Sequence, residues 1–171
     1  MTLLSSCGQS AVQDETATDY NQYIPSHGVT AYTKDLYIFF DSGRLFYVGR
    51  SQPSQLFPLC FQADCDHKNS SCTAWLNTPS RSIYAAGDNL YYIDADKDAN
   101  PALYRMDLSG GGRELVKSLN ILNEESWPGI SSLGYSFRVY GSYLAIELNL
   151  LQEDSWQHKI YLTGIDSKDE G

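Results

Sequence analysis

Long apolar runs and basic residues are both scarce in this sequence of 171 residues. No stretch approaches the roughly 20 apolar residues that a membrane-spanning helix needs. Only 12 residues are Lys or Arg against 21 Asp or Glu, which gives a formal net charge of −9. Because this charge opposes contact with phosphate backbones and anionic lipid, we expect no nucleic-acid partner and membrane association only through a covalent lipid anchor.

Recognised catalytic motifs are also missing. The sequence contains no G-x-S-x-G, no H-E-x-x-H and no G-x-x-x-x-G-K-[ST]. His27 and His158 stand at a predicted strand entry and in a predicted loop, where a histidine is usually a surface residue. The sequence therefore predicts a protein without catalytic activity. The alternative is a fragment of a surface enzyme acting on polysaccharide or peptide, because the carboxylate pairs of glycosidases meet only in the fold.

Strand-forming residues are abundant. The sequence has 13 tyrosines against only 2 methionines. Aromatic side chains suit a pleated, half-buried surface, so the composition favours strands. The length fits one domain. We therefore expect a single all-β domain.

A repeat of 54 residues organises the sequence. Leu36, Leu90 and Leu144 recur at that interval, each following a turn signal, and are predicted to be buried at equivalent places. A third strand follows in each unit, with intervals of 58 and 57, at residues 45–48, 103–106 and 160–162. We attribute the drift to the loop before this strand, which lengthens to 94–101 in the second unit and 149–157 in the third.

A fourth strand is predicted after the first two units, at about 56–61 and 114–119. Four antiparallel strands per unit make a propeller blade, so we predict a partial β-propeller of about three blades, with a curved β-sheet or a β-sandwich as alternatives. The domain spans residues 23–171, with units at about 27–80, 81–134 and 135–171. Because propellers have about 4 to 8 blades, we expect a fragment of a longer propeller, or an open arc that self-associates through its edge strands.

Two segments resemble a known group of propellers. Asn-Leu-Tyr-Tyr-Ile-Asp at 89–94 and Leu-Tyr-Arg-Met-Asp-Leu-Ser-Gly at 103–110 resemble the repeats of bacterial surface lipoproteins. Those repeats are similar in turn to low-density-lipoprotein-receptor-type and TolB-like propellers. The resemblance covers about residues 27–171 and implies a propeller of unknown function at the cell surface.

The N-terminus resembles a lipoprotein processing site. Leu4-Ser5-Ser6-Cys7 is similar to a bacterial lipobox, which makes Cys7 the predicted lipidation site and residues 1–7 the remnant of an export signal. Such a signal needs more residues before the cysteine, so we expect it to be clipped or its start to be misassigned; the other interpretation is a chance match. Residues 8–22 are polar and acidic, which is typical of a tether. These features predict an extracytoplasmic, membrane-anchored lipoprotein of a bacterium.

The strongest local motif is a C-x4-C-x-H-x4-C pattern formed by Cys60, Cys65, His67 and Cys72. Three thiols and one imidazole suit a tetrahedral zinc ion, and four protein ligands leave no open position for water, so a structural ion is expected. The alternatives are one disulfide with a leftover thiol, or three free cysteines. Residues 73–76 are expected to form a short helical turn over the site. The lipoprotein resemblance also implies a structural role for this loop.

Residues 94–100 place carboxylates at alternate positions, as at the start of a calcium loop. Ala99 stands where the sharp turn of such a loop needs Gly, and Arg105 stands where a bidentate Glu is needed. The sequence therefore predicts a solvated hairpin loop here, with weak calcium binding as the alternative.

Two tryptophans are candidate ligand-binding residues. Trp127 and Trp156 are both predicted in loops, which carry binding more often than strands do. Their amphipathic rings offer contact area to a sugar ring or to a partner protein. We expect a non-catalytic cell-surface binding or scaffolding module for a glycan or a protein.

Overall fold

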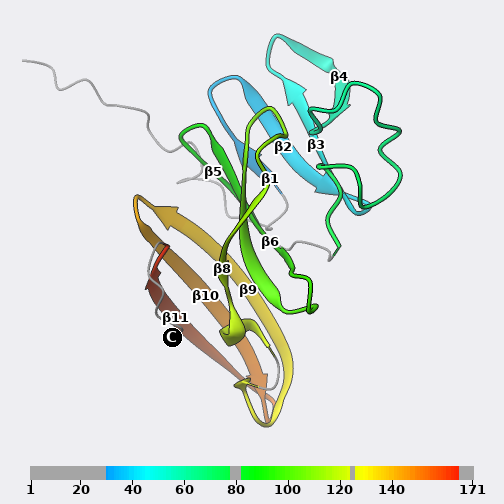
Figure 1. Cartoon of the computed structure of the whole chain (residues 1–171). Helices are drawn as coiled ribbons and strands as arrows, with labels where there is room; N and C mark the ends of the chain where they lie inside the picture. Colours follow the sequence, from blue (N-terminus) through cyan, green and yellow to red (C-terminus); the bar gives the residue numbers. More distant parts are fainter. Residues whose placement is uncertain (1–29, 78–81, 124–125, 166–171) are drawn as a thin grey trace, which may run out of the picture.

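A computed structural model describes residues 30–77, 82–123 and 126–165 (Figure 1). The predicted lipidation site Cys7 and the predicted tether at 8–22 lie outside these residues. In the part of the chain that the structure describes, no helix is long and apolar enough to cross a membrane.

The first sheet is a four-stranded antiparallel meander in sequence order. A two-residue turn of Ser42 and Gly43, with φ angles of 49° and 83°, joins its second and third strands. Positive φ at both turn residues matches the right-handed twist of a hairpin. The strands are β1 (Thr30–Tyr32), β2 (Leu36–Asp41), β3 (Arg44–Gly49) and β4 (Gln52–Pro58).

The second sheet repeats this meander and lies between the other two (Figure 1). Its central strands are buried on both faces: Tyr91, Tyr92 and Ile93 are each less than a tenth exposed. A short 3-10 helix, η2 (Asn120–Leu122), follows it. The strands are β5 (Ile83–Ala86), β6 (Asn89–Ala95), β7 (Pro101–Asp107) and β8 (Glu114–Ser118).

The third sheet has three strands within the described residues, in the order β11-β10-β9. The loop predicted at 149–157 is wrong: β10 and β11 pair through this region and are joined by a two-residue turn, Glu153 and Asp154, both at positive φ. Trp156 and His158 therefore lie on a strand. The strands of this sheet are β9 (Ile130–Tyr140), β10 (Tyr143–Gln152) and β11 (Ser155–Gly164). The predicted unit boundary at 134–135 is wrong, because it falls inside β9.

Two apolar cores hold the three sheets face to face. One core joins the first and second sheets, through side chains such as Ile38, Leu45 and Tyr92. The other joins the second and third sheets, through side chains such as Leu103 and Ile146. The first strand of the second sheet, β5, contacts β1 on one side and β9 on the other. Two four-stranded meanders and a three-stranded one, stacked in this way, confirm the predicted all-β partial propeller, and three separate sheets exclude the two alternatives.

The strand pairing corrects the predicted repeat by one residue. In the first hairpins Tyr32 pairs with Tyr37, Ala85 with Leu90, and Val139 with Leu144. Tyr37, and not Leu36, is thus equivalent to Leu90 and Leu144, so the first interval is 53. Leu90 and Leu144 are fully buried as predicted, whereas Leu36 is half-buried because a one-residue shift places it on the opposite face.

The third strands keep the predicted intervals of 58 and 57. Leu45 pairs with Phe40, Leu103 with Ile93, and Ile160 with Glu147, and these partners are equivalent in the corrected register. A stacked aromatic pair occurs at equivalent positions of the first and second sheets. The rings of Phe39 and Phe46 stack at 5.9 Å, and those of their equivalents, Tyr92 and Tyr104, also stack at 5.9 Å.

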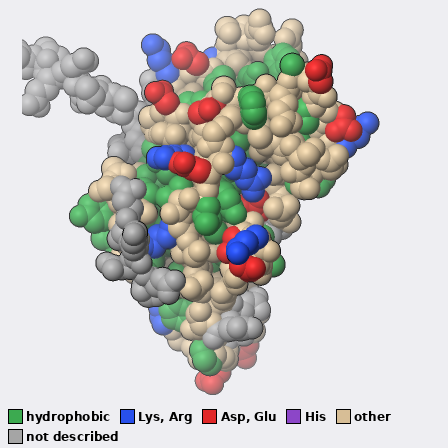
Figure 2. All heavy atoms as spheres, viewed as in Figure 1, with side chains coloured by type: hydrophobic (Ala, Val, Ile, Leu, Met, Phe, Trp, Pro, Cys, Tyr) green, Lys and Arg blue, Asp and Glu red, His purple; other side chains and the backbone are tan. Residues whose placement is uncertain are grey.

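Each sheet therefore has two distinct faces. We call the face that bears Phe39 and Phe46, or their equivalents, the leading face, and the face that bears Leu45, or its equivalents, the trailing face. The trailing face of the first sheet packs on the leading face of the second, and the trailing face of the second packs on the leading face of the third. On the side shown in Figure 2, acidic and basic side chains are interspersed with hydrophobic ones.

Candidate metal centre

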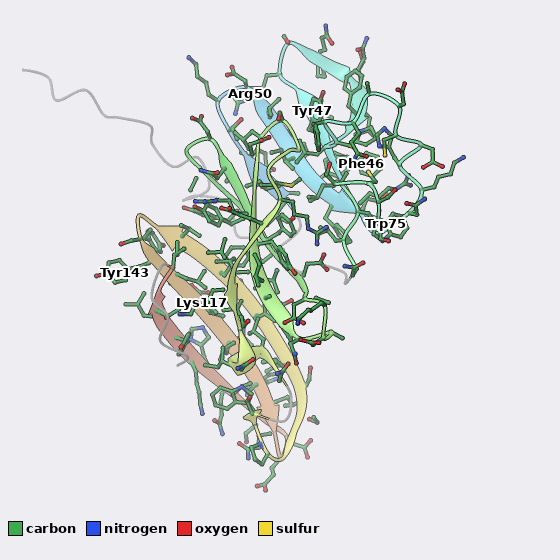
Figure 3. The ribbon with its side chains drawn as sticks, viewed as in Figure 1. Phe46, Tyr47, Arg50, Trp75, Lys117 and Tyr143 are labelled. Carbon is green, nitrogen blue, oxygen red and sulfur yellow. The ribbon has the colours of Figure 1, made fainter. Side chains whose placement is uncertain are left out.

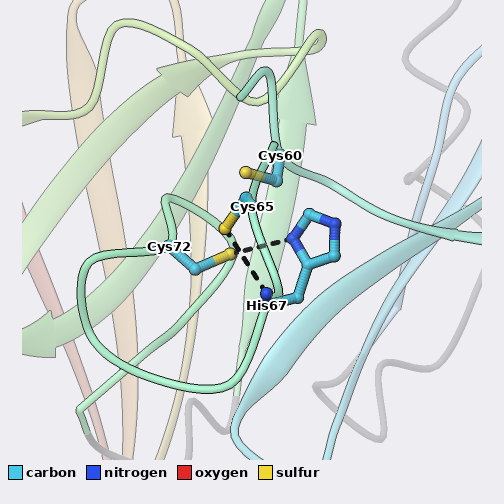
Figure 4. A group of neighbouring side chains, drawn as sticks. All are labelled: Cys60, Cys65, His67 and Cys72. Carbon is cyan, nitrogen blue, oxygen red and sulfur yellow. Dashed lines mark hydrogen bonds between the residues drawn. The ribbon is translucent and has the colours of Figure 1, made fainter. Parts of the chain in front are cut away.

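The four predicted ligands come together in the loop between β4 and β5. The ligand atoms of Cys60, Cys65, His67 and Cys72 all lie within 4.8 Å of one another (Figure 4). Cys72 is 1% exposed, and the other three are half-buried. The three sulfur atoms are free thiols in this structure.

The spacing of these atoms fits a tetrahedral ion. With metal–sulfur distances of about 2.3 Å and a metal–nitrogen distance of about 2.0 Å, neighbouring ligand atoms lie roughly 3.5–3.8 Å apart. His67 Nδ1 lies 3.4 Å from Cys72 Sγ. The cluster thus supplies the three sulfur atoms and one nitrogen of a tetrahedral site. Side-chain rotations that shorten the longest ligand–ligand distances, now up to 4.8 Å, would allow all four atoms to bind one ion.

The backbone of His67 is held in an uncommon conformation. Its φ angle is 56°, in the left-handed region that disfavours residues with a Cβ. Two contacts fix it there: its N–H donates to Cys65 Sγ at 3.4 Å, and its carbonyl accepts from Arg44 Nη1 at 3.2 Å. This conformation turns the imidazole toward the sulfur atoms.

The thiols differ in acidity. Burial raises the pKa of Cys72 to about 12. Burial acts in the same direction on Cys60, but polar groups of Thr73 and the backbone of Gln62 favour its thiolate and lower its pKa to about 6. The surroundings thus favour the thiolate at Cys60 and the neutral thiol at Cys72, and a bound cation would favour the deprotonated form of each thiol.

The loop is fastened to the first sheet at both of its ends. Leu59 N–H donates to Leu45 O at 2.9 Å, and Leu45 N–H donates in turn to Ala74 O at 2.8 Å. Trp75 forms a β-bridge with Arg44. The prediction of a helical turn at 73–76 is therefore wrong: the chain forms one turn at 72–75, in which Trp75 N–H donates to Cys72 O at 3.0 Å, and this turn runs into the bridge.

The loop is fastened to the second sheet through Asp94, which is completely buried. Asp94 Oδ1 accepts from Asn77 N–H at 2.9 Å, and its Oδ2 pairs with Arg113 Nη2 at 2.5 Å. The Arg113 guanidinium also donates to Trp75 O at 2.9 Å and lies over the Tyr104 ring. The prediction of a solvated loop at 94–100 is therefore wrong for Asp94.

The rest of that segment agrees with the prediction of a hairpin loop. Asp96 Oδ1 accepts from the N–H groups of Asp98 and Asn100, each at 2.9 Å. Ala99 has a φ angle of 65°, so it takes the sharp turn without being glycine. The Asp96 carboxylate thus holds the turn, and both Asp96 and Asp98, unlike Asp94, lie outside the core.

A glycine-rich turn of the second sheet presses on the start of the loop. A Cβ on Gly110 would lie 2.5 Å from Leu59 O and 2.8 Å from Cys60 N. Hydrogen bonds from Ser109 Oγ and from the N–H groups of Ser109 and Gly111 close this turn onto Asp107 and lower its pKa. The two sheets therefore meet, backbone against backbone, directly beside the first predicted ligand.

Solvent reaches the cluster from one side. A polar depression of about 610 Å³ is lined by Gln62, Asp64, Cys65, Asp66 and neighbouring residues. This opening gives a metal ion or a chelator a path to the sulfur of Cys65.

The two candidate tryptophans do not share a site. Trp127 is half-buried, donates its indole N–H to Ile121 O at 2.7 Å, and is covered by Lys159 Nζ at 4.4 Å from the ring centre. Trp156 is 66% exposed. Because Trp156 and Lys159 are three residues apart on β11, they point to opposite faces of the sheet.

No protein-family model matches the sequence, and no curated protein matches it. Solved structures that resemble part of the fold include the following two. One is a chain in the S. cerevisiae complex of Dbp5 bound to Nup159, Gle1, IP6 and ADP, with 11% identity over 77% of this chain and a TM-score of 0.43. The other is the N-terminal domain of Nup159, with 10% identity over 80% of this chain and a TM-score of 0.42. This chain covers 30% and 31% of those chains.

Proposed function

We propose that this protein is a non-catalytic binding or scaffolding module outside the cytoplasm of a bacterium, and that a structural zinc ion joins its first two blades. The observation that carries the zinc part of the proposal is the placement of all four ligand atoms, within 4.8 Å, in a loop bonded to both sheets. The location and the binding role stay predictions from the sequence. Four protein ligands leave no open coordination position for a substrate. Sulfur and nitrogen donors favour zinc over the hard cations.

Metal content and free thiols together test the zinc proposal. In freshly purified, unreduced protein we expect close to one zinc per chain by elemental analysis, and each sulfur about 2.3 Å from the ion by X-ray absorption. Denaturation in the presence of a chelator should then release all three thiols of the cluster for titration. Negligible zinc together with a single titratable thiol among Cys60, Cys65 and Cys72 would show a disulfide instead.

For recognition, we propose that Trp156 contacts the glycan or protein ligand. Its ring is 66% exposed, whereas the indole N–H and one ring face of Trp127 have partners within the chain. A large rigid ring supplies contact area at a low cost in side-chain entropy.

A polysaccharide array probed with the Trp156→Ala variant tests this role. Loss of an aromatic contact at the centre of an interface costs about 2 kcal/mol, so we expect binding to weaken at least about tenfold. Phe61→Ala is the matched control, because Phe61 is 59% exposed on another part of the surface. Equal binding by the Trp156 variant and the unmodified protein would contradict the role.

A further inference from the structure

The trailing face of the third sheet presents the residues that pack between sheets elsewhere in the molecule. Leu45 on the first sheet and Leu103 on the second are both completely buried against the next sheet. Their equivalent on the third sheet, Ile160, is 68% exposed, and Leu162, two residues further on the same face, is 64% exposed. Ile160 therefore occupies a position that a following blade covers.

The equivalents of Leu162 lie at the border of the two internal contacts: Tyr47 packs against the first core, and the Arg105 side chain is 42% exposed. Trp156 lies on the trailing face of the third sheet too, but near the turn between β10 and β11, at a position for which the shorter strands β3 and β7 have no equivalent.

The leading face of the first sheet presents the other half of the same interface. Phe39 and Phe46 stack there as Tyr92 and Tyr104 do on the second sheet, where the pair packs on the preceding sheet. Leu56, which pairs with Val48 on this face, is 54% exposed. Figure 3 shows Phe46 on the first sheet and Tyr143 on the third, with the second sheet between them.

We propose that two copies of this chain associate head to tail, the trailing face of the third sheet in each copy packing on the leading face of the first sheet in the other. The argument is continuity with the two interfaces inside the chain, which join the same pair of faces. The described residues form three sheets, so two copies supply six, within the roughly 4 to 8 blades that close a propeller. Each copy contributes one face of each kind, so both contacts form at once and the ring closes as a dimer.

This contact differs from pairing through the edge strand β11. Edge pairing uses backbone groups and leaves Ile160 and Leu162 exposed, whereas a face contact buries both side chains. Substitution of the two side chains therefore separates the two modes of association.

Light scattering and sedimentation of the full chain test the proposal. We expect a mass of twice 19.1 kDa for the unmodified protein. The double variant Ile160→Lys, Leu162→Lys and the single variant Leu56→Lys should each be monomeric, because a charge on either face disrupts both contacts of the ring. Leu115→Lys is the control and should stay dimeric, since Leu115 is equally accessible, at 52% exposed, but lies on the second sheet. Circular dichroism verifies the fold of each variant.

Mixing the variants identifies the orientation. An equimolar mixture of the Leu56 variant with the Ile160, Leu162 variant has one intact face of each kind, so we expect the dimer to return with weaker affinity. A monomeric unmodified protein, or a dimer that the face variants leave intact, overturns the proposal. So does a dimer that the Leu56 substitution leaves intact while the other abolishes it, because that result means pairing of like faces. A mass that grows beyond two chains with concentration overturns the closed ring.

Discussion

Replacement of Asp94 with alanine is expected to lower the free energy of unfolding by about 3–5 kcal/mol, the usual cost of breaking a buried ion pair from one side. Asp94 is completely buried and pairs with Arg113, whose side chain is 22% exposed. The substitution leaves the guanidinium without its carboxylate and the N–H of Asn77 without its acceptor. For a chain of this size the loss corresponds to a fall in melting temperature of roughly 6–20 °C.

Chemical denaturation and thermal melts measure this effect. Asp98→Ala is the matched control: Asp98 is a carboxylate of the same hairpin, 65% exposed in its side chain, and its removal should cost within about 0.5 kcal/mol. Adding Arg113→Met to Asp94→Ala should recover part of the loss, because no unpaired charge then stays buried. Equal stability of the Asp94 and Asp98 variants would show that the pair does not hold the loop to the second sheet.

The sequence predicts the Cys/His cluster but not the buried ion pair that holds its loop to the second sheet. All four ligands fall within a segment of thirteen residues, so their convergence is a local property of the loop and the spacing alone predicts it. The Asp94–Arg113 pair joins residues 19 apart across two strands and a turn. A carboxylate in a hairpin is usually solvated, and only the packed fold shows that this one is buried.

The one-residue error in the repeat has a physical cause. Register is read from alternation of apolar and polar residues, but β6 is buried on both faces and has apolar neighbours at Tyr91, Tyr92 and Ile93. Because β6 shows no alternation, the repeat can be aligned only by matching leucines, and matching Leu36 to Leu90 assigns the residues of the first unit to the wrong face of the sheet. The opposite problem affects β11, whose exposed residues at 155–159 resemble a polar loop, so the sequence predicts only 160–162 as strand and misses the first half of β11.

Removal of the proposed zinc is expected to lower the melting temperature by roughly 8–16 °C. An ion that binds only the folded state stabilises it by about 4 kcal/mol when free metal is a thousand times its Kd, and in a chain of this size each 1 kcal/mol corresponds to about 2–4 °C. Residues 61–71 of the loop are exposed or half-buried and lie between the points where backbone hydrogen bonds join the loop to the first sheet, so we expect the proposed ion to supply much of their order. Thermal melts with and without a chelator measure the shift.

Ligand variants separate a metal from a disulfide. Cys72→Ser and His67→Asn should each lower the melting temperature and abolish the effect of the chelator. Asn suits position 67 because it tolerates a left-handed backbone while removing the imidazole. Asp64→Ala, an exposed carboxylate of the same loop outside the cluster, should leave both unchanged. If the loop is instead closed by a disulfide, His67→Asn has little effect and reductant lowers the melting temperature. The response of His67, which a disulfide does not use, therefore decides between the two cross-links.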